Sequence, residues 1–353
     1  METLLNAKKF SKQFSSNEGG GIVMLFRATG IGLDIGSKKI KLARVKKVKK
    51  GLELMDFASM PTPNGVIEYG KIIAPVELGK AISSLVKEMG WKGQKVISAL
   101  SNQEIFFDNF ILPRMNRRES RKAALYQSSS FLPFPLDEAA FDIFFLREIE
   151  NGQGRKREVF FAAAQSLQVE HLKKVCTLAG LRLTVVEIPA LALNRLWNNN
   201  NGKDLTVFLN IGYSYACFSV FQQEKLLFQR SFVSFLEGMI DILGDNILLE
   251  EVDITENLQL QELMEEFLAR VKQMLSLFQP QEREMIIARI LLCGGGAKLK
   301  GLAGYLSMVL NAIVPTLNLP ATLALPPKFE QYKQELSCDF SVAIGLASRG
   351  VLG

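Results

Sequence analysis

The chain contains a single histidine, His171, among 353 residues, and only four cysteines. Because His171 falls on the surface of a predicted helix, Ser-His-Asp triads and metal sites built from several histidines are excluded. Cys176, Cys217, Cys293 and Cys338 lie far apart without a Cys-x-x-Cys pair, which indicates buried thiols in a reducing cytoplasm. No apolar run approaches the ~18–20 residues of a membrane-spanning helix, so no transmembrane segment is predicted.

Acidic residues are in the minority: 36 Asp and Glu stand against 42 Lys and Arg, a net charge of +6. The excess is concentrated in two runs, namely Lys38, Lys39, Lys41, Arg44, Lys46, Lys47, Lys49 and Lys50, and then Arg114, Arg117, Arg118, Arg121 and Lys122. No aromatic residue interrupts the lysine run, which argues against a platform for single-stranded nucleic acid. An anionic membrane surface is the better candidate for a partner of these runs. The remaining composition, 48% apolar and 22% charged, is typical of a globular chain with room for two domains.

Residues 31–45 have the pattern of a strand, a tight turn and a second strand. Gly36 permits a turn in which backbone N–H groups and the Ser37 hydroxyl converge on an anion, with Lys38 beside it. Asp34, at the end of the first strand, could hold Mg²⁺ through water. The hairpin therefore predicts a site for a nucleotide phosphate.

The same device recurs in residues 205–220, where Asn210, Gly212, Tyr213 and Ser214 occupy the turn. Each hairpin is followed by a third apolar segment, at residues 52–57 and 226–232. We interpret this as a divergent internal repeat. Two such hairpins facing each other could hold a polyphosphate from both sides.

A third motif lies in residues 290–302, where a short buried strand is followed by Gly294, Gly295 and Gly296, then Lys298, and then an amphipathic helix. Glycines between a strand and a helix N-terminus allow the backbone to approach a flat ring or a phosphate closely. This motif completes the predicted nucleotide site.

The order of the three motifs resembles the phosphate-1, phosphate-2 and adenosine motifs of the actin-like ATPase superfamily. Within it, residues 132–142, 185–193 and 341–349 resemble the type IV pilus assembly protein PilM family, which is related to the division protein FtsA. The resemblance spans about residues 30–350. It implies an α/β fold of two related mixed-sheet domains, with an inserted α+β subdomain, and it implies ATP and Mg²⁺ as cofactors.

This resemblance gives a division of the chain. Residues 1–29 are expected to form a flexible leader, and Met24 is an alternative translation start. Residues 30–100 and 330–353 are expected to form the first subdomain (1A). Residues 101–190 are predicted as the inserted subdomain (1C), in which Asn116 and Glu119 cap a helix, and residues 191–329 as the second domain (2A/2B), with a long amphipathic helix from residue 260 that ends at Pro280.

The resemblance also implies a function: a cytoplasmic scaffold at the inner membrane that docks the N-terminal tail of a PilN-like membrane protein and links it to other platform and motor proteins of the pilus. We expect the tail to bind between the insertion and the first α/β layer, near Phe131, Pro133 and Phe134, whose prolines hold the segment extended. Arg117, Arg118 and Arg121 would orient this end towards an anionic leaflet.

Asn210 departs from the superfamily pattern, because an acid is usual at this position. An amide brings no charge to a metal, so ATP binding is expected with weak or absent hydrolysis, and no catalytic residue is assigned. Three alternatives stay open: a type II secretion platform component, an FtsA-like filament protein capable of self-association, and a small-molecule kinase. The kinase alternative would need a catalytic carboxylate and a substrate pocket, for which the sequence offers no motif.

Overall fold

The computed structural model describes residues 29–151, 154–197, 204–244, 248–252, 258–278 and 287–352. The predicted leader, apart from Thr29, lies outside these ranges. Pro280, predicted to end the long helix, also lies outside them. Within the described part, no helix is both long and apolar enough to span a membrane.

Six strands form the first sheet, in the order β10-β6-β1-β2-β3-β15. They are β1 (Thr29–Ile35), β2 (Lys39–Val48), β3 (Gly51–Pro61), β6 (Lys95–Ala99), β10 (Arg182–Glu187) and β15 (Leu323–Ala324). β1, β2 and β3 are antiparallel neighbours, whereas β6 runs parallel to β1 and β10 runs parallel to β6. A small ribbon of β4 (Ile67–Glu68) and β5 (Lys71–Ile72) follows β3.

Four strands form the second sheet, in the order β13-β12-β11-β14. They are β11 (Leu205–Ile211), β12 (Tyr215–Gln222), β13 (Lys225–Val233) and β14 (Ile287–Cys293). Their order and directions repeat those of β3, β2, β1 and β6. The registers also agree, because Leu33 pairs with Leu42 in one hairpin and Leu209 with Phe218 in the other. The predicted internal repeat is therefore confirmed.

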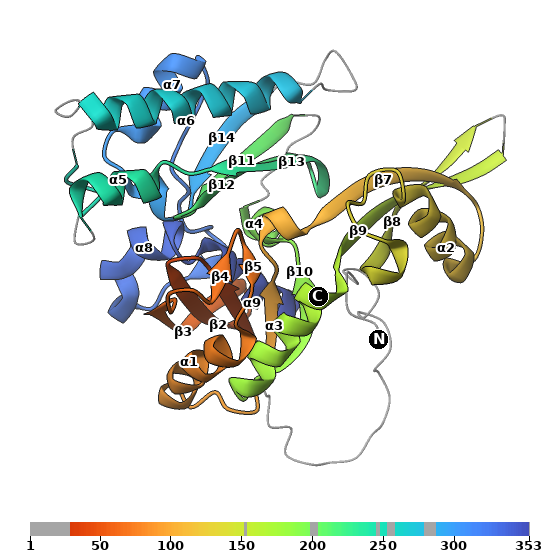
Figure 1. Ribbon diagram of the computed structural model, residues 1–353, viewed down its shortest axis with the longest axis horizontal. Coiled ribbons are helices and arrows are strands. Elements are labelled where there is room, and N and C mark those ends of the chain that lie inside the picture. Colours follow the sequence, from red (N-terminus) through yellow and green to blue (C-terminus); the bar gives the residue numbers. More distant parts are fainter. Residues whose placement is uncertain are drawn as a thin grey trace.

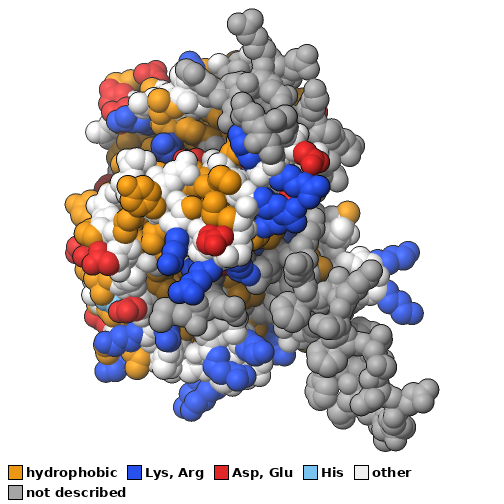
Figure 2. Space-filling view, turned by 90° about the vertical axis from the view of Figure 1, so that its right-hand side faces the viewer, with side chains coloured by type: hydrophobic (Ala, Val, Ile, Leu, Met, Phe, Trp, Pro, Cys, Tyr) orange, Lys and Arg blue, Asp and Glu red, His pale blue; other side chains and the backbone are white. Residues whose placement is uncertain are grey.

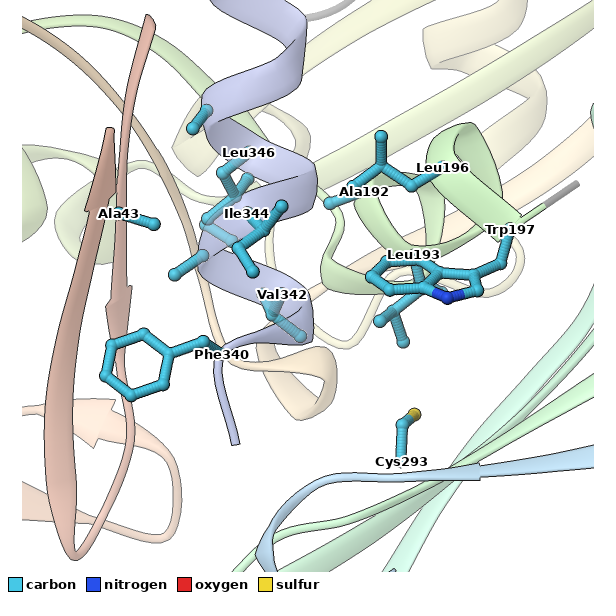
Figure 3. Packing of buried hydrophobic residues seen from close by; sticks show 14 of the residues in the cluster. Ala43, Ala192, Leu193, Leu196, Trp197, Cys293, Phe340, Val342, Ile344 and Leu346 are labelled. Atoms are coloured by element: carbon cyan, nitrogen blue, oxygen red, sulfur yellow. The ribbon is translucent and has the colours of Figure 1, made fainter. Parts of the chain in front are cut away.

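Helices cover both faces of the first sheet and bury its alternating apolar side chains (Figure 1). One face holds α1 (Pro75–Glu88) and α3 (Ser166–Leu178), and the other holds α4 (Pro189–Trp197) and α9 (Ser341–Leu352). Figure 3 shows Val342, Ile344 and Leu346 of α9 between Ala43 of β2 and Ala192 of α4. α9 thus lies inside the core, between the first sheet and the helix that leads to the second.

The second sheet packs against α5 (Leu236–Leu243), α6 (Leu258–Leu277) and α7 (Leu302–Leu310), and α8 (Lys333–Cys338) then leads into α9. The apolar stripe predicted for the long helix is confirmed as core, since α6 buries Leu260, Met264, Phe267, Leu268 and Val271. Lys272 on its other face is exposed.

A third sheet, in the order β7-β9-β8, projects to one side of the molecule (Figure 1). It comprises β7 (Phe106–Pro113), β8 (Ala139–Asn151) and β9 (Gly154–Gln165), and it packs against α2 (Arg117–Ser128) around a core of its own. The predicted cap of α2 is confirmed: the Glu119 backbone N–H donates to Asn116 Oδ1 at 2.9 Å and the Asn116 N–H donates to Glu119 Oε2 at 3.1 Å. We call this sheet, α2 and their connections the inserted unit.

The inserted unit also contacts the second sheet. Lys225 at the start of β13 forms an ion pair with the buried carboxylate of Glu158 in β9, which also accepts from Arg147 Nε at 2.6 Å. Asn109 Nδ2 in β7 donates to the Leu226 carbonyl at 3.2 Å. The inserted unit is therefore braced against the hairpin of β12 and β13.

Three elements differ from the predicted boundaries. The strand predicted to close the inserted subdomain is β10, which pairs with β6 in the first sheet, and α3 packs on α1 rather than on the third sheet alone. β15 pairs with β3, so the chain returns to the first sheet before residue 330. A local sequence pattern predicts a strand but does not say which sheet it joins.

Candidate functional site

The first predicted phosphate turn connects β1 and β2. The Gly36 N–H donates to the Lys39 carbonyl at 3.1 Å, and a Cβ added at Gly36 would lie 2.8 Å from that oxygen. The Lys38 carbonyl accepts from the Thr62 N–H at 3.0 Å. Only glycine fits this turn without displacing the backbone.

The second predicted turn, between β11 and β12, has the same geometry. The Gly212 N–H donates to the Tyr215 carbonyl at 3.0 Å, a Cβ at Gly212 would again lie 2.8 Å from that oxygen, and the Ser214 carbonyl accepts from the Ser234 N–H at 3.0 Å. The repeat thus extends to the hydrogen bonds that fix each turn.

The two turns touch each other. Ser214 Oγ donates to Ser37 Oγ at 3.1 Å, and Lys38 Nζ lies 4.9 Å from the centroid of the Tyr213 ring. Four of the predicted site residues, distant in the sequence, therefore meet at one point between the two sheets. Hydroxyls and an ammonium group in this arrangement suit a phosphate.

The glycine-rich segment packs directly behind the second turn. Gly294 has φ +81°, and a Cβ there would lie 2.4 Å from the Ile211 carbonyl oxygen and 2.5 Å from Asn210 Oδ1. A Cβ at Gly296 would lie 2.3 Å from Ile211 Cγ2, whereas a Cβ at Gly295 would meet only Asp339 Oδ1, at 3.0 Å. Gly294 and Gly296 are therefore required by packing, and Gly295 is the glycine at which a side chain could be added.

Lys298 is held by acids rather than left free for a ligand. Its Nζ lies 3.0 Å from Asp339 Oδ2 and 3.7 Å from Glu250 Oε1, and 19% of its side chain is exposed. Burial lowers the pKa of Lys298, but the Asp339 carboxylate outweighs burial and holds that pKa above its usual value. Asp339, which the sequence reasoning missed, therefore contacts both Gly295 and Lys298. The only sequence signal for it is an acid just before the apolar helix α9.

Asp34, the predicted metal-binding residue, is also paired. Lys41 lies directly opposite it in the β1–β2 register, and Lys41 Nζ is 3.3 Å from Asp34 Oδ2. At the equivalent place in the second hairpin, Asn210 is opposite Cys217. Among the described residues, no three or more His, Cys, Asp or Glu side chains are grouped closely enough to share a metal ion.

The residues predicted for the partner groove pack largely within the inserted unit. The Phe131 ring lies 6.1 Å from the rings of Phe110 and Phe161, and Phe134 lies edge-on to Phe106 at 5.5 Å between centroids. Pro133 is exposed. Phe131 thus packs against the core of the inserted unit, and both Phe131 and Phe134 remain partly exposed.

The nearby arginines are likewise engaged. Arg121 forms an ion pair with the largely buried carboxylate of Asp142, and Arg117 Nη2 lies 4.0 Å from it. Burial raises the pKa of Asp142 despite its hydrogen bond from Ile143 N–H and the two arginines. Of the three arginines expected to face a membrane, only Arg118 makes no such contact with Asp142.

A small apolar recess lies where the inserted unit meets the first sheet. Residues from β9, α3 and β10, and from the connections that follow β6, precede β7 and follow β10, line it: Leu100, Ile105, Ala162, Ala163, Ala164, Val169, Val186, Glu187 and Ile188. The sequence reasoning missed these residues, because their apolar pattern is that of an ordinary core.

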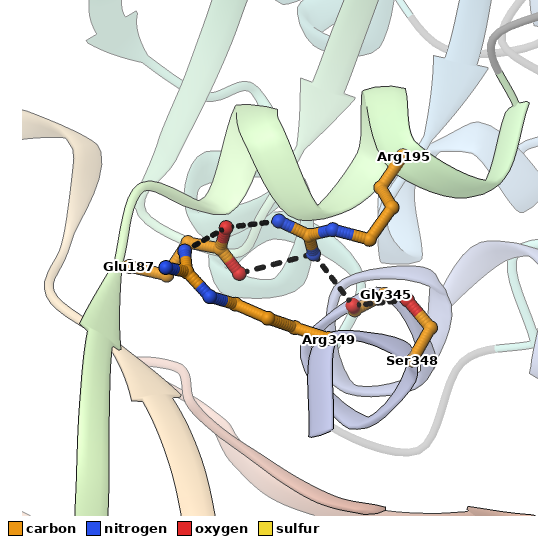
Figure 4. A network of polar contacts seen from close by, with 5 residues as sticks. All are labelled: Glu187, Arg195, Gly345, Ser348 and Arg349. Atoms are coloured by element: carbon orange, nitrogen blue, oxygen red, sulfur yellow. Dashed lines mark hydrogen bonds and ion pairs between the residues drawn. The ribbon is translucent and has the colours of Figure 1, made fainter. Parts of the chain in front are cut away.

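Glu187 links this recess to the two helices between the sheets (Figure 4). Its fully buried carboxylate accepts from Arg195 of α4, with Nη1 at 3.1 Å from Oε2, and from Arg349 Nη1 of α9 at 2.7 Å. Arg195 Nη1 also donates to the Gly345 carbonyl of α9 at 2.9 Å. A Cβ at Gly345 would lie 2.3 Å from the Ala192 carbonyl, so α4 and α9 cross with their backbones in near contact.

Comparisons with known proteins agree with this geometry. The sequence model of the family described as type IV pilus assembly protein PilM matches residues 32–234. The alignment with a chain of the solved PilM-PilN type IV pilus biogenesis complex covers 91% of this chain and 98% of the chain in that complex, at 25% identity and a TM-score of 0.80. The ethanolamine utilization protein EutJ from Carboxydothermus hydrogenoformans aligns with 92% of this chain and 90% of its own, at 14% identity and a TM-score of 0.52, which shows the fold alone.

Two repeated α/β domains, with paired turns between them and a glycine-rich segment behind the second, define an actin-like ATPase fold, as the sequence predicted. More narrowly, the chain belongs to the type IV pilus assembly protein PilM family, and its role lies in the assembly of type IV pili.

Proposed function

We propose that this protein is an ATP-binding scaffold at the cytoplasmic face of the inner membrane, where it docks the N-terminal tail of a PilN-like membrane protein and connects it to the pilus motor. The observation that carries the proposal is the likeness, over 91% of the chain, to a protein solved in the PilM-PilN complex. The meeting of the two turns at Ser37 and Ser214 supports the nucleotide part.

In the proposed site, the turns of both hairpins hold the phosphates and the glycine-rich segment holds the adenosine. The residues are Asp34, Gly36, Ser37, Lys38, Asn210, Gly212, Tyr213, Ser214, Gly294, Gly295, Gly296 and Lys298. Ser37 and Ser214 offer hydroxyl donors, and Lys38 offers a charge that can reach between the turns. Lys298, already paired with Asp339, acts on the position of Gly295 rather than on the phosphates.

Mg²⁺, when bound with the nucleotide, would screen the phosphate charge. Asp34 would contact it through water, in competition with Lys41. Asn210 contributes no charge, so the second turn binds phosphate without adding a metal ligand. We therefore expect slow hydrolysis or none.

For the partner tail, the apolar recess lies at the expected place between the inserted unit and the first sheet. Seven of its nine lining residues are buried, so a peptide would reach it at its partly exposed rim, formed by Ile105 and Val169. An extended apolar segment of a peptide would cover Val169 and the neighbouring side chains of the recess. The Phe134 ring, which stays partly exposed, marks the alternative location.

ATP binding is tested by Gly295→Trp, with Gly304→Trp as the matched control. Gly295 has no positive φ, and an added Cβ meets only the end of the Asp339 side chain, whereas a Cβ at Gly304 meets nothing within 4 Å. Calorimetric titration should show ATP binding lost in the first variant and kept in the second, with circular dichroism unchanged in both. Unchanged affinity in a folded Gly295→Trp protein refutes the placement.

Tail docking is tested with a synthetic peptide of the partner's N-terminal tail. Val169→Glu should abolish peptide binding, whereas Lys298→Ala, on the nucleotide side, should retain it. Loss in Phe134→Glu but not in Val169→Glu would move the site to the aromatic segment. If both folded variants bind the peptide normally, the proposed location is wrong.

A further inference from the structure

The end of the first sheet that points away from the phosphate turns carries an unusual charge. β1, β6 and β10 begin at this end, where Arg182 is opposite Lys95, and the hairpin of β2 and β3 turns there, between Val48 and Gly51. We call it the basic end of the sheet. Its exposed cations come from four separate parts of the sequence: Lys47, Lys49, Lys50, Lys87, Lys92, Lys95 and Arg182.

These cations are close together and uncompensated. Lys92 Cγ is 3.3 Å from a Cβ added at Gly180, Arg182 Nε donates to the Gly93 carbonyl at 2.8 Å, and Lys87 lies in the last turn of α1. β10, β6, β1, β2 and β3 are adjacent, so at ~4.8 Å per strand the row is about 20 Å wide. Within the described residues, none of the seven side chains forms an ion pair with a carboxylate.

The whole chain has a net charge of +6, and the basic end holds seven of its 42 Lys and Arg residues. Figure 2 shows Lys and Arg side chains with few acids at the lower end of the molecule, the end at which the first sheet lies in Figure 1. The Debye length is ~10 Å at 0.1 M salt, so cations spaced in this way act on a partner as one positive surface.

We propose that the basic end rests directly on an anionic phospholipid bilayer. Six of the seven cations are lysines, which act as hydrated point charges suited to lipid headgroups rather than to bidentate base recognition. The aromatic residue nearest in sequence, Trp91, is only 2% exposed, so stacking on nucleobases is not offered. Leu352, 49% exposed at the end of α9, lies beside this end, because Gly350 packs on Gly30.

Residues 1–28 join the chain at this same end, ahead of Thr29, and their sequence contains Lys8, Lys9, Lys12 and Arg27. The phosphate turns lie at the opposite end of β1 and β2, so lipid contact requires neither nucleotide nor partner peptide. This inference rests on the membrane location in the proposed function and deepens it by naming the surface that faces the bilayer, and the vesicle test can fail while nucleotide and peptide binding still hold.

The test is co-sedimentation of the full chain with vesicles, without ATP or peptide. The basic-end variant is Lys47→Glu/Lys49→Glu/Lys50→Glu. The matched control is Arg270→Glu/Lys272→Glu/Lys328→Glu, which makes the same change of net charge at exposed residues outside both basic runs of the sequence. The wild type should pellet with phosphatidylglycerol vesicles but not with phosphatidylcholine vesicles, and high salt should release it.

The basic-end variant should bind the phosphatidylglycerol vesicles at least about tenfold more weakly than the wild type, and the control should match the wild type. Equal binding by both variants overturns the proposal, as does loss in the control alone. Equal binding of the wild type to phosphatidylcholine would also overturn it, since the attraction would not be electrostatic. Stronger binding to a short nucleic acid duplex than to the anionic vesicles would show that the partner class is wrong.

Discussion

Replacing Glu187 by Gln should destabilise the protein strongly. The Glu187 side chain is fully buried and neutralises Arg349, whose side chain is 6% exposed, and Arg195, whose side chain is 20% exposed. Glutamine keeps the size but leaves both guanidinium groups without a counter-charge. Removing one partner of a buried ion pair costs about 3–5 kcal/mol. For a chain of this size about 2 °C of melting temperature corresponds to each kcal/mol, so the expected loss is about 6–10 °C.

The assay is thermal unfolding followed by circular dichroism, with two comparison variants. Arg147→Ala removes a side chain that is 69% exposed and leaves Glu158 paired with Lys225, so it should cost less than about 1 kcal/mol. Glu187→Gln/Arg349→Met also removes the more deeply buried unpaired charge and should recover part of the loss. A Glu187→Gln protein that melts within about 2 °C of the wild type would refute the assignment of the network as a stabilising element.

Three further outcomes are expected. The wild type should hydrolyse ATP more slowly than ~1 s⁻¹, and Asn210→Asp should raise metal-dependent binding or turnover; ordinary enzyme rates in the wild type would contradict the argument from Asn210. Burial raises the pKa of Cys176 and Cys338 to about 12, raises that of Cys217 to about 11, and raises that of Cys293 well above its usual range. At about pH 8 none of the four thiols should therefore react with a disulfide reagent until the protein unfolds. Prompt reaction of even one thiol would be inconsistent with this structure. Burial acts to raise the pKa of Glu158, but hydrogen bonds from Lys225 and Arg147 hold that pKa below its ordinary value. The stability that Glu158→Gln removes should therefore be fully present above the ordinary glutamate pKa and should be lost as the pH falls through the lower pKa of the folded state; a stability difference independent of pH would count against this pairing.

The parts of the site that could be predicted depend on local sequence. Gly36 and Gly212 were recognisable because a tight turn between two alternating strands needs glycine and a following polar residue, and the three glycines after β14 were recognisable from a strand-to-helix junction. Asn116 and Glu119 were identified from the spacing of a capping box. In each case, residues within a few positions of one another determine the structure.

The parts that were missed depend on contacts between distant segments. Glu187, Arg195 and Arg349 look like ordinary polar residues in sequence, and only the crossing of α4 and α9 brings them together. Phe131 is predicted to line the partner groove, and its contact with Phe161, 30 positions away, could not be read from the local sequence. The pairing of β10 with β6 is likewise set by the return of the chain after the inserted unit.

The inserted unit has two attachments of different kinds. The chain itself joins it to the first sheet, before β7 and after β9. Its contacts with the second sheet are noncovalent and include the Lys225–Glu158 ion pair, the Asn109 hydrogen bond and apolar packing. A change in the angle between the two sheets must therefore either move the inserted unit or break these contacts. If these contacts persist, the orientation of the inserted unit depends on the angle between the two sheets. Because the inserted unit projects from the molecule, a bound protein could respond to that angle.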